Sequence, residues 1–322
     1  MFRIRKLLVV LMLASSVSGA VAQAWPSRTV RIIVPFSAGG TVDVLAREIA
    51  SRLSPALGQQ FLVENRAGAN GQIGAEALVR SQADGYTIGL LGTPHAAAGF
   101  LQKAPYDIFT DFTPVTLLAN VPSLLSVSAA LPVQNLRDLI ALARERPGKL
   151  SYAHGGNLTA GHLAMEMLRS QAEAEIMSVP YKGGAPALLG IVGGQVDALI
   201  IGPSAQLPHI RAGKLRPIAV ASLRRIAIMP DVPTIAESNV PGLTQTITEW
   251  YGLFAPAKLP LEVLQRLNTE VLKVLATADT RARLQMLGAE PVGGRPDELA
   301  SHVRVESERV GMLIRKLSLK SD

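Results

Sequence analysis

Hydrophobic and polar positions follow two different periodicities along this chain. Short runs of apolar, often β-branched residues, such as 30–34 and 198–201, are typical of buried strands. Segments with apolar residues three or four positions apart, such as 41–57 and 261–277, are typical of helices that cover a sheet. The two kinds of segment alternate along most of the chain, with no internal repeat or low-complexity stretch. This alternation predicts α/β layers with largely parallel sheets.

The same reading predicts the remaining elements. Further strands are expected at 61–64, 86–91, 112–118, 124–127, 150–153, 176–179 and 216–221. Further helices are expected at 73–81, 135–145, 159–170, 185–192, 280–287 and 296–316.

The most informative stretch is Val30–Asp43, which reads VRIIVPFSAGGTVD. The strand 30–34 ends at Pro35, Gly39 and Gly40 allow a tight turn, and a helix begins at Thr41. Such a junction points free backbone N–H groups and the positive end of a helix dipole at one place. It predicts an anion site without a charged side chain, although the same junction also occurs for purely structural reasons.

Two further stretches use the same device. Residues 150–170 contain His154-Gly155-Gly156 between a strand and a helix, with Thr159 as the expected N-cap. Residues 179–192 contain Gly183-Gly184 before another helix. Because ligands of open α/β sheets bind where helix N-termini converge, the repetition favours a ligand site. If the first two junctions belong to different domains, they can hold an anion from both sides of a cleft.

The N-terminus predicts export. Three basic side chains within residues 3–6 precede the apolar segment 7–14, and Ala22-Gln23-Ala24 fits a signal-peptidase site. The apolar run is too short to span a bilayer. We therefore expect residues 1–24 to be cleaved after Ala24 and the mature chain to begin at Trp25, in the periplasm. The chain has no cysteine, which excludes a disulfide framework, a thiolate nucleophile and a lipid-anchored lipoprotein.

Charge and aromatic content narrow the ligand class. The formal charge of +7 includes the three basic residues of the expected signal, and the others are dispersed. Aromatic residues make up 4% of the chain, which disfavours stacking platforms for nucleic acids or sugars. We expect a small, polar, anionic ligand and no nucleic acid.

Over its whole mature length the chain resembles the extracytoplasmic solute receptors of tripartite tricarboxylate transporters, the Bug proteins first described in Bordetella. The resemblance rests on matching stretches that include WPSRTVRIIVPFSAGGTVDVLAR (25–47), GQQFLVENRAGANGQIGAE (58–76), DGYTIGLLG (84–92), PYDIFTDFTPVTLLA (105–119), RPGKLSYAHGGNLTAGHLAME (146–166), VPYKGGAPALLGIVGGQVDALI (179–200), LPHIRAGKLRPIAV (207–220) and MPDVPTIAE (229–237).

The resemblance implies a type II periplasmic-binding-protein fold, with two domains around a central ligand cleft and a hinge. It also implies a small carboxylate ligand held largely by backbone amides and waters, and membrane permease subunits as partners. Receptors of this type cross between their domains twice, so we expect domain 1 at 25–122 plus 249–322 and domain 2 at 123–248. We expect a monomer, no cofactor, no metal and no catalytic residue.

The matching positions imply the ligand-binding residues. In the first loop they are Phe36, Ser37, Ala38, Gly39, Gly40, Thr41 and Asp43; in the second loop they are His154, Gly155, Gly156, Asn157, Thr159 and His162; Thr93, Gly202 and Trp250 complete the set.

The chain departs from the family pattern at two of these places. Ser37-Ala38 stands where two prolines are common, and Ala153-His154 where Gly-Ser is usual. The second departure puts a serine contact in doubt and places an imidazole near the pocket. We expect either a neutral His154 that replaces the serine's hydrogen bond, or a protonated one that strengthens carboxylate binding as the pH falls toward about 6.

Several candidate residues have a structural explanation beside the functional one. His162 and Glu166 share a helix face that suits a metal, but no third ligand is nearby and a structural role is favoured. Asp43 either contacts the ligand or holds the loop amides. Lys182 is a counter-ion, a Schiff-base lysine or a solvent-facing side chain. Ser204 lacks the G-x-S-x-G pattern of a hydrolase nucleophile.

The sequence therefore predicts a solute receptor with no chemistry of its own, which closes around its ligand and delivers it to a permease. Two alternatives stay open. The closed form is read by a membrane signalling protein, or the chain is an exported α/β hydrolase that uses His154 or His162.

Overall fold

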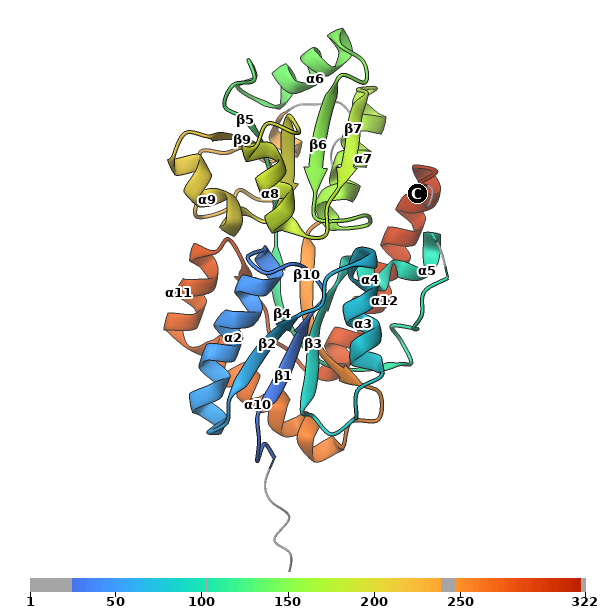
Figure 1. Ribbon diagram of the computed structural model, residues 1–322, viewed down its shortest axis with the longest axis vertical. Helices are drawn as coiled ribbons and strands as arrows, with labels where there is room; N and C mark the ends of the chain where they lie inside the picture. Colours follow the sequence, from blue (N-terminus) through green and yellow to red (C-terminus); the bar gives the residue numbers. More distant parts are fainter. Residues whose placement is uncertain (1–24, 102, 239–246, 320–322) are drawn as a thin grey trace, which may run out of the picture.

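The computed structural model describes residues 25–101, 103–238 and 247–319, which form two α/β domains stacked along the long axis of the molecule (Figure 1). The expected signal peptide, residues 1–24, lies outside the described residues. No helix of the described part is long and apolar enough to cross a bilayer.

The lower domain in Figure 1 contains a six-stranded sheet with the order β11-β4-β10-β3-β1-β2. Its strands are β1 (Val30–Val34), β2 (Phe61–Asn65), β3 (Thr87–Gly92), β4 (Phe112–Val121), β10 (Glu249–Pro256) and β11 (Glu290–Pro291). The upper domain contains a five-stranded sheet with the order β7-β6-β8-β5-β9. Its strands are β5 (Ser123–Ser128), β6 (Leu150–His154), β7 (Ile176–Pro180), β8 (Ala198–Ile201) and β9 (Leu215–Ala221).

The expectation of largely parallel sheets is wrong, because both sheets are mixed. The pairs β1–β2, β1–β3, β6–β7 and β6–β8 are parallel. The pairs that involve β4, β5 and β10 are antiparallel. The physical reason is the chain path: β4 leads through Pro122 directly into β5 of the other sheet, and β10 brings the chain back. A strand that passes between domains has no crossover helix, which a parallel neighbour would need.

Helices cover both faces of each sheet. The helices are α2 (Thr41–Leu57), α3 (Gln72–Val79), α4 (Thr93–Ala96), α5 (Ala98–Leu101), α6 (Leu136–Glu145), α7 (Ala160–Ala172), α8 (Gly184–Val192), α9 (Pro203–Arg211), α10 (Leu261–Ala276), α11 (Ala278–Met286) and α12 (Pro296–Lys316), with 3-10 turns at Ala69–Gly71 and Ala236–Ser238. In the lower domain α2 and α10 share one core with the sheet, whereas α3 and α12 pack in another. In the upper domain α6 and α7 share one core, whereas α8 and α9 pack in another.

The apolar stripes behave as their spacing predicts. Leu45, Ile49 and Leu53 of α2 are buried against the lower sheet. Each such leucine or isoleucine contributes roughly 1.5–3 kcal/mol when it is fully buried. The cores therefore fix the helices, and with them the loops at their N-termini.

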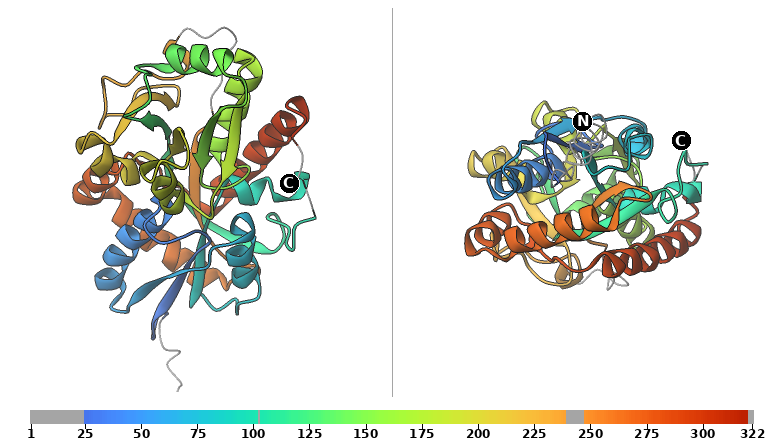
Figure 2. Two further views of the ribbon diagram at one scale, coloured as in Figure 1. Left: turned by 45° about the horizontal axis from the view of Figure 1, so that its top comes forward. Right: turned by 90° about the horizontal axis from the view of Figure 1, so that it is seen from below.

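The last helix connects the two domains. Val310 and Ile314 of α12 share a buried cluster with Leu163 and Met167 of α7 and with Ala97. Seen from below, the orange and red C-terminal helices lie along one side of the molecule (Figure 2). The C-terminal helix of the lower domain thus packs against the upper domain, near its second glycine loop.

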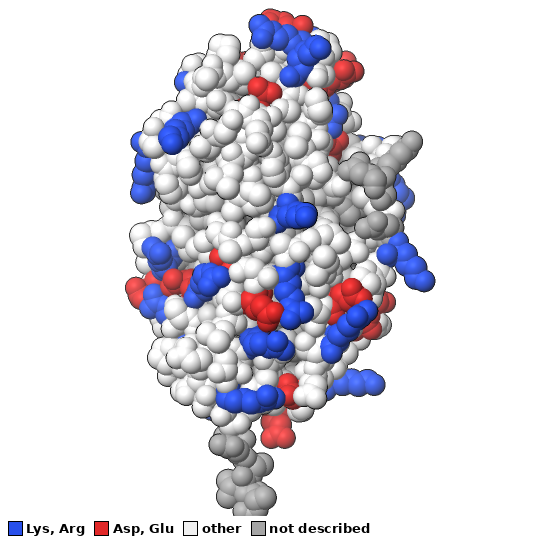
Figure 3. All heavy atoms as spheres, viewed as in Figure 1, with Lys and Arg blue, Asp and Glu red and all other residues white. Residues whose placement is uncertain are grey.

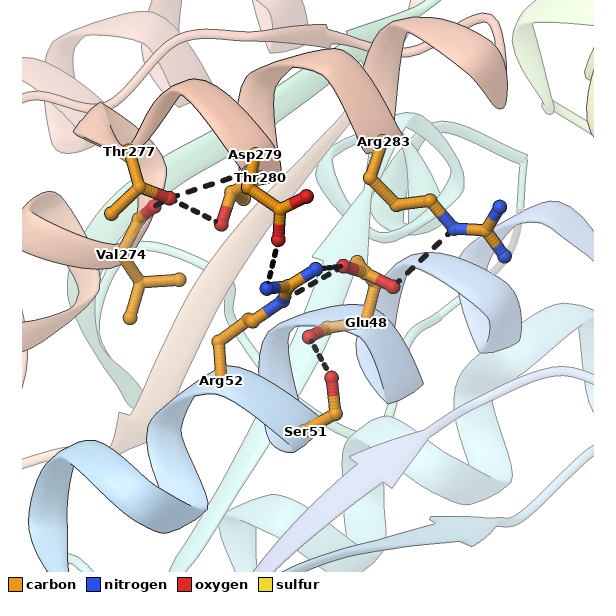
Figure 4. A network of polar contacts seen from close by, with 8 residues as sticks. All are labelled: Glu48, Ser51, Arg52, Val274, Thr277, Asp279, Thr280 and Arg283. Atoms are coloured by element: carbon orange, nitrogen blue, oxygen red, sulfur yellow. Dashed lines mark hydrogen bonds and ion pairs between the residues drawn. The ribbon is translucent and has the colours of Figure 1, made fainter.

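A network of charged side chains holds α2 against α11 (Figure 4). Arg52 binds Glu48, at 2.9 Å, and Asp279 of α11, while Arg283 approaches Glu48 at 3.6 Å. Thr277 caps α11 by accepting a hydrogen bond from the Thr280 amide. Because Asp279 is exposed and the Arg52 guanidinium is accessible to solvent, water screens these ion pairs. The network fixes the orientation of α2 more than it adds stability.

Most expected elements are present with shifted ends, but α4, α5, α9 and β11 were not expected. Helix α9 was not expected because it contains Pro203 and Pro208, yet Pro203 stands at its first position, where proline costs no hydrogen bond. Strand β10 begins at Glu249, where domain 1 was expected to resume. On the face seen in Figure 3, the lower domain carries basic side chains interspersed with acidic ones, as expected for solvated surface.

Candidate ligand-binding site

A cavity of about 50 Å³ lies between the two sheets. A volume of this size holds about two water molecules at the density of the liquid, so the closed cavity suits only a small ligand. Both domains contribute to its wall. From the lower domain come Phe36, Gly40, Thr41, Val42, Pro94, Val121, Glu249 and Tyr251; from the upper domain come Ser123, Gly155, Thr159, Gly161, Gly183, Gly184, Ile200, Ile201 and Gly202.

Three helices begin at this cavity without a side-chain cap. The N-caps of α2, α8 and α9 are Gly40, Gly183 and Gly202, which have no side chain to accept a hydrogen bond from the first turn. The α2 and α8 ends face each other, because a Cβ on Gly40 would lie 3.5 Å from the amide nitrogen of Gly184. The N-terminus of a helix carries a positive partial charge, so two facing N-termini repel each other unless an anion lies between them.

The first glycine loop is held in place by Asp43. Its buried carboxylate accepts hydrogen bonds from the amide of Gly39, from Asn65 and from Arg47, each at 2.9 Å. Burial by itself would raise the pKa of Asp43, but these hydrogen bonds outweigh it and hold the pKa below its ordinary value. Of the two readings of Asp43, this geometry matches the one in which it orders the loop amides.

The second glycine loop is closed by its own side chains. Thr159 caps α7 by accepting a hydrogen bond from the His162 amide, and its hydroxyl donates to the carbonyl of Gly156 at 2.7 Å. Leu158 adopts a left-handed conformation with a φ of 61°. Its amide donates to Nδ1 of His162 at 3.2 Å. The His162 imidazole therefore stabilises this turn by accepting a hydrogen bond from its backbone.

His154 lies beneath this loop and does not line the cavity. It is fully buried, with Nδ1 2.9 Å from the carbonyl oxygen of Gly156 and Nε2 2.9 Å from the hydroxyl of Ser178. Its ring centroid is 4.6 Å from that of His162. Burial, together with the nearby positive charge of Arg169, lowers the pKa of His162 to about 4, so this second imidazole is neutral at pH 7.

The expected pair His162 and Glu166 is only loosely associated. Nε2 of His162 lies 3.9 Å from the Glu166 carboxylate, which accepts hydrogen bonds from Tyr152 and Arg169 instead. Within the described ranges no group of three or more His, Asp or Glu side chains could hold a metal ion.

Glu249 is the one acidic side chain among the described residues of the cavity wall. It is the first residue of β10 and pairs with Val121, at the point where the two domain-crossing strands meet. Its Oε1 accepts from the amide of Thr93 in the lower domain at 3.0 Å. Its Oε2 accepts from the amide of Ala160 in the upper domain at 2.9 Å. Burial raises the pKa of Glu249, and these hydrogen bonds offset part of the rise.

The alternation of β10 decides which of its side chains reach the cavity. Glu249 and Tyr251 lie two residues apart and line the wall, whereas Trp250 points to the other face of the sheet. There its ring meets His302 edge-on, at a centroid distance of 5.1 Å. Burial, with the Glu249 carboxylate nearby, raises the pKa of Tyr251 well above its ordinary value, so the phenol keeps its proton.

Direct contacts also join the domains across the mouth of the cavity. The amide and the hydroxyl of Ser37 donate to the carbonyl of Lys182, at 3.3 and 2.7 Å. Asn70 donates through Nδ2 to the carbonyl of Asn157. The side chain of Lys182 is exposed and is not part of the cavity wall. The structure therefore represents a closed arrangement of the domains.

The expected site residues fall into two groups. Those that line the cavity are Phe36, Gly40, Thr41, Gly155, Thr159 and Gly202. Those that lie around the wall are Ser37, Ala38, Gly39, Asp43, Thr93, His154, Gly156, Asn157, His162 and Trp250. Several of these support the wall, as Asp43 and Thr93 do through their hydrogen bonds.

Sequence reasoning left several wall residues out of the expected site, among them Gly183, Gly184, Glu249 and Tyr251. The third glycine junction was visible, but it was not included in the expected site. A lone carboxylate at the start of an otherwise apolar strand was the available signal for Glu249.

Comparisons with known proteins agree with this geometry. The family described as tripartite tricarboxylate transporter family receptor matches residues 45–319. BugT of Bordetella pertussis is 35% identical over 303 residues, which cover 93% of this chain and 92% of BugT.

Two similar solved structures are described as containing organic acids. Rpa4515 of R. palustris with adipate is 40% identical with a TM-score of 0.89, and the match covers 92% of this chain and 99% of that one. MatC of Rhodopseudomonas palustris with bound malate is 32% identical with a TM-score of 0.83, covering 90% of this chain and all of that one. The expected fold class and the resemblance to the Bug proteins are confirmed.

Proposed function

The chain belongs to the family of tripartite tricarboxylate transporter receptors, which includes the Bug proteins, and on that premise we propose that it binds a small carboxylate in the cavity between its two domains. In this proposal the closed, loaded form is delivered to the membrane permease of such a transporter. The proposal goes beyond family membership because it assigns the binding of the anion to backbone amides at the N-termini of α2 and α8.

One observation carries the proposal. Uncapped N-termini of α2 and α8, one from each domain, face each other across a small cavity whose described wall contains no Lys or Arg. Backbone N–H groups at helix N-termini bind carboxylates without a cationic side chain. The adipate and malate of the two R. palustris structures are ligands of this class.

The mechanism follows from the contacts across the cavity. We propose that domain 1 comprises 25–122 with 249–322, that domain 2 comprises 123–248, and that they rotate about the strand crossings at 121–123 and 248–249. A carboxylate between α2 and α8 removes the repulsion between their N-termini and so favours closure. Closure then forms the contacts of Ser37 with Lys182 and of Asn70 with Asn157.

The proposal also covers location and assembly. We propose a periplasmic monomer that is released by cleavage after Ala24. Determining the N-terminal residue of the exported protein tests the cleavage, with Trp25 as the expected result. Light scattering of the purified chain, with and without ligand, tests the monomer.

A thermal-shift screen tests the proposed function. Purified protein is heated with propanoate, malonate, succinate, malate, glutarate, adipate and amino acids of two to five carbons. A ligand at 100 times its Kd raises the free energy of unfolding by about 2.7 kcal/mol, which displaces the melting temperature by several degrees. If no small carboxylate stabilises the protein, the proposal is wrong.

The same samples separate a receptor from an enzyme. We propose that the chain has no catalytic activity, so a stabilising carboxylate should be recovered unchanged after long incubation with substoichiometric protein. Consumption of that carboxylate in excess over the protein would identify an enzyme instead.

A further inference from the structure

The wall of the cavity has two ends of opposite character. At one end the uncapped amides of α2 and α8 suit an anion. At the other end lies the carboxylate of Glu249, with Tyr251 beside it on the same strand face. A ligand that fills this cavity meets both ends, since the cavity holds only about two water molecules.

Glu249 occupies two backbone amides at the cavity that a second ligand carboxylate could otherwise bind. The amide of Ala160 begins α7, whose N-terminus is otherwise capped by Thr159, and this amide is bound to Glu249 at 2.9 Å. The amide of Thr93 is bound to the other carboxylate oxygen at 3.0 Å. A second carboxylate of the ligand would therefore lie against a buried carboxylate, and like charges in a site of low dielectric disfavour each other strongly.

The Glu249 carboxylate still has capacity to accept hydrogen bonds. A carboxylate offers about four lone-pair positions. The two backbone amides use one position on each oxygen, and the hydroxyl of Thr93 also donates to the carboxylate, which leaves about one position. No Lys or Arg lines the described wall to use the rest or to balance the charge. A buried carboxylate without a cation is costly, which is the physical cause of the raised pKa of Glu249.

We propose that Glu249 makes this receptor select carboxylates that also carry a protonated amine, that is, small zwitterionic amino acids, over dicarboxylates and plain monocarboxylates. This inference rests on the proposed function of the cavity. The ligand carboxylate binds between the N-termini of α2 and α8, and the ammonium group donates to Glu249. The bound complex then adds no net charge to the cavity, because each ligand charge meets an opposite one.

The experiment compares the affinities of the purified protein for ligands of matched size. Dissociation constants are measured by calorimetry for alanine, β-alanine, propanoate and malonate, all of which have three carbons. The variants are Glu249→Gln, which keeps the size of the side chain but removes its charge, and Glu306→Gln. Glu306 lies outside the cavity wall but contributes a negative charge near Glu249, so it is the matched control for a long-range effect.

The wild-type protein should bind at least one of the two amino acids about tenfold or more tightly than propanoate and malonate. In Glu249→Gln this preference should fall below about threefold, whereas Glu306→Gln should keep it. Because the readout is a ratio of affinities within one protein, a change in stability does not mimic it. If Glu249→Gln does not fold, the wild-type ratio still decides.

Two results overturn the inference and leave the proposed function intact. One is wild-type protein that binds malonate or propanoate as tightly as both amino acids. The other is an amine preference that persists in Glu249→Gln. Failure of every carboxylate in the screen to bind would instead overturn the proposed function, and the inference with it.

Discussion

The first and second glycine loops look alike in the sequence and differ in the structure. Both join a buried strand to a helix through two adjacent glycines, Gly39-Gly40 and Gly155-Gly156. In the first loop the N-terminus of α2 has no side-chain cap. In the second loop Thr159 and Glu249 bind the amides at the start of α7. The same motif therefore leaves one helix end available to an anion and closes the other.

A glycine junction is therefore an anion site only where nothing else in the fold binds its amides. Glu249 lies about 90 positions away from the loop that it caps, so local sequence cannot reveal it. The backbone amides available to an anion are therefore those at the starts of α2 and α8, whose glycine N-caps face each other. Five variants or conditions test the contrast between the two loops.

Gly40→Val should abolish binding, by at least about 100-fold in Kd. A Cβ at this position would lie 3.4–3.7 Å from Ser37, Gly184 and Ala185, so the added methyl groups of valine would enter the space between the two helix ends. The φ of Gly40 is −78°, which valine adopts without strain, so the fold should survive. Gly99→Val is the matched control, because its Cβ would meet nothing within 4 Å. Calorimetry with a ligand from the screen measures the effect.

Acid should destabilise the second loop region through His162. Its pKa is lowered from 6.5 to about 4 in the folded protein, so the unfolded chain binds the proton more readily. The contribution of His162 to the free energy of unfolding is therefore fully present above pH 6.5. About 2–3 kcal/mol of it is lost as the pH falls toward 4. His162→Asn keeps an acceptor for the Leu158 amide and should flatten this part of the curve. Urea denaturation at pH 7, 5.5 and 4.5 measures it, and an unchanged slope in the variant would contradict this assignment.

Thr159→Ala should cost about 1 kcal/mol of stability, because it removes the side-chain cap of α7. Thr159→Ser keeps the hydroxyl and should cost much less. The first loop offers no equivalent variant, since its N-cap is a glycine. Denaturant titration of the three proteins gives the difference, and equal stabilities would show that Glu249 alone suffices as the cap.

Asn70→Gly should weaken ligand affinity by about three- to tenfold, because closure loses the hydrogen bond from Asn70 to the carbonyl of Asn157. Asn70 has a φ of 55°, and glycine accepts this conformation, so the change acts on the contact across the mouth. Affinity by calorimetry and the melting temperature without ligand separate closure from folding. A variant with unchanged affinity would show that this contact does not contribute to closure.

Lys182→Ala should leave affinity unchanged within about twofold. Ser37 binds the backbone carbonyl of Lys182, and the lysine side chain is exposed. A loss of binding in this variant, combined with intact binding in Gly40→Val, would mean that a cation holds the ligand and that the backbone account is wrong.

Much of the fold could be predicted from local patterns, and the exceptions are non-local. The stripe of α2 and the run of β1 are properties of adjacent residues, so their spacing sufficed. The direction of β4, β5 and β10 depends on where the chain changes domain, and no local pattern encodes it. The proline-rich start of α9 looks like a loop until its first turn is seen to need no N–H at Pro203.

The site shows the same division. Gly40 and Thr41 are in the cavity wall because their own junction places them there. His154 belongs to the same kind of junction, yet its side chain turns under the loop to Ser178, on a neighbouring strand. The His154 imidazole is buried against the rings of Tyr152 and His162 and does not reach the cavity wall. The expected rise of carboxylate affinity on protonation of His154 therefore stays a prediction, and the His154 side chain makes no contact with the cavity wall that would cause it.

The most direct test of the central claim is a crystal structure of the protein with a carboxylate selected by the screen. The account predicts that the carboxylate oxygens lie within hydrogen-bond distance of backbone amides at the starts of α2 and α8, about 2.7–3.2 Å from residues such as Thr41 and Gly184. Glu249 should keep its bonds to Thr93 and Ala160. A carboxylate bound by a lysine or arginine side chain, or one that displaces Glu249 at the start of α7, would contradict it.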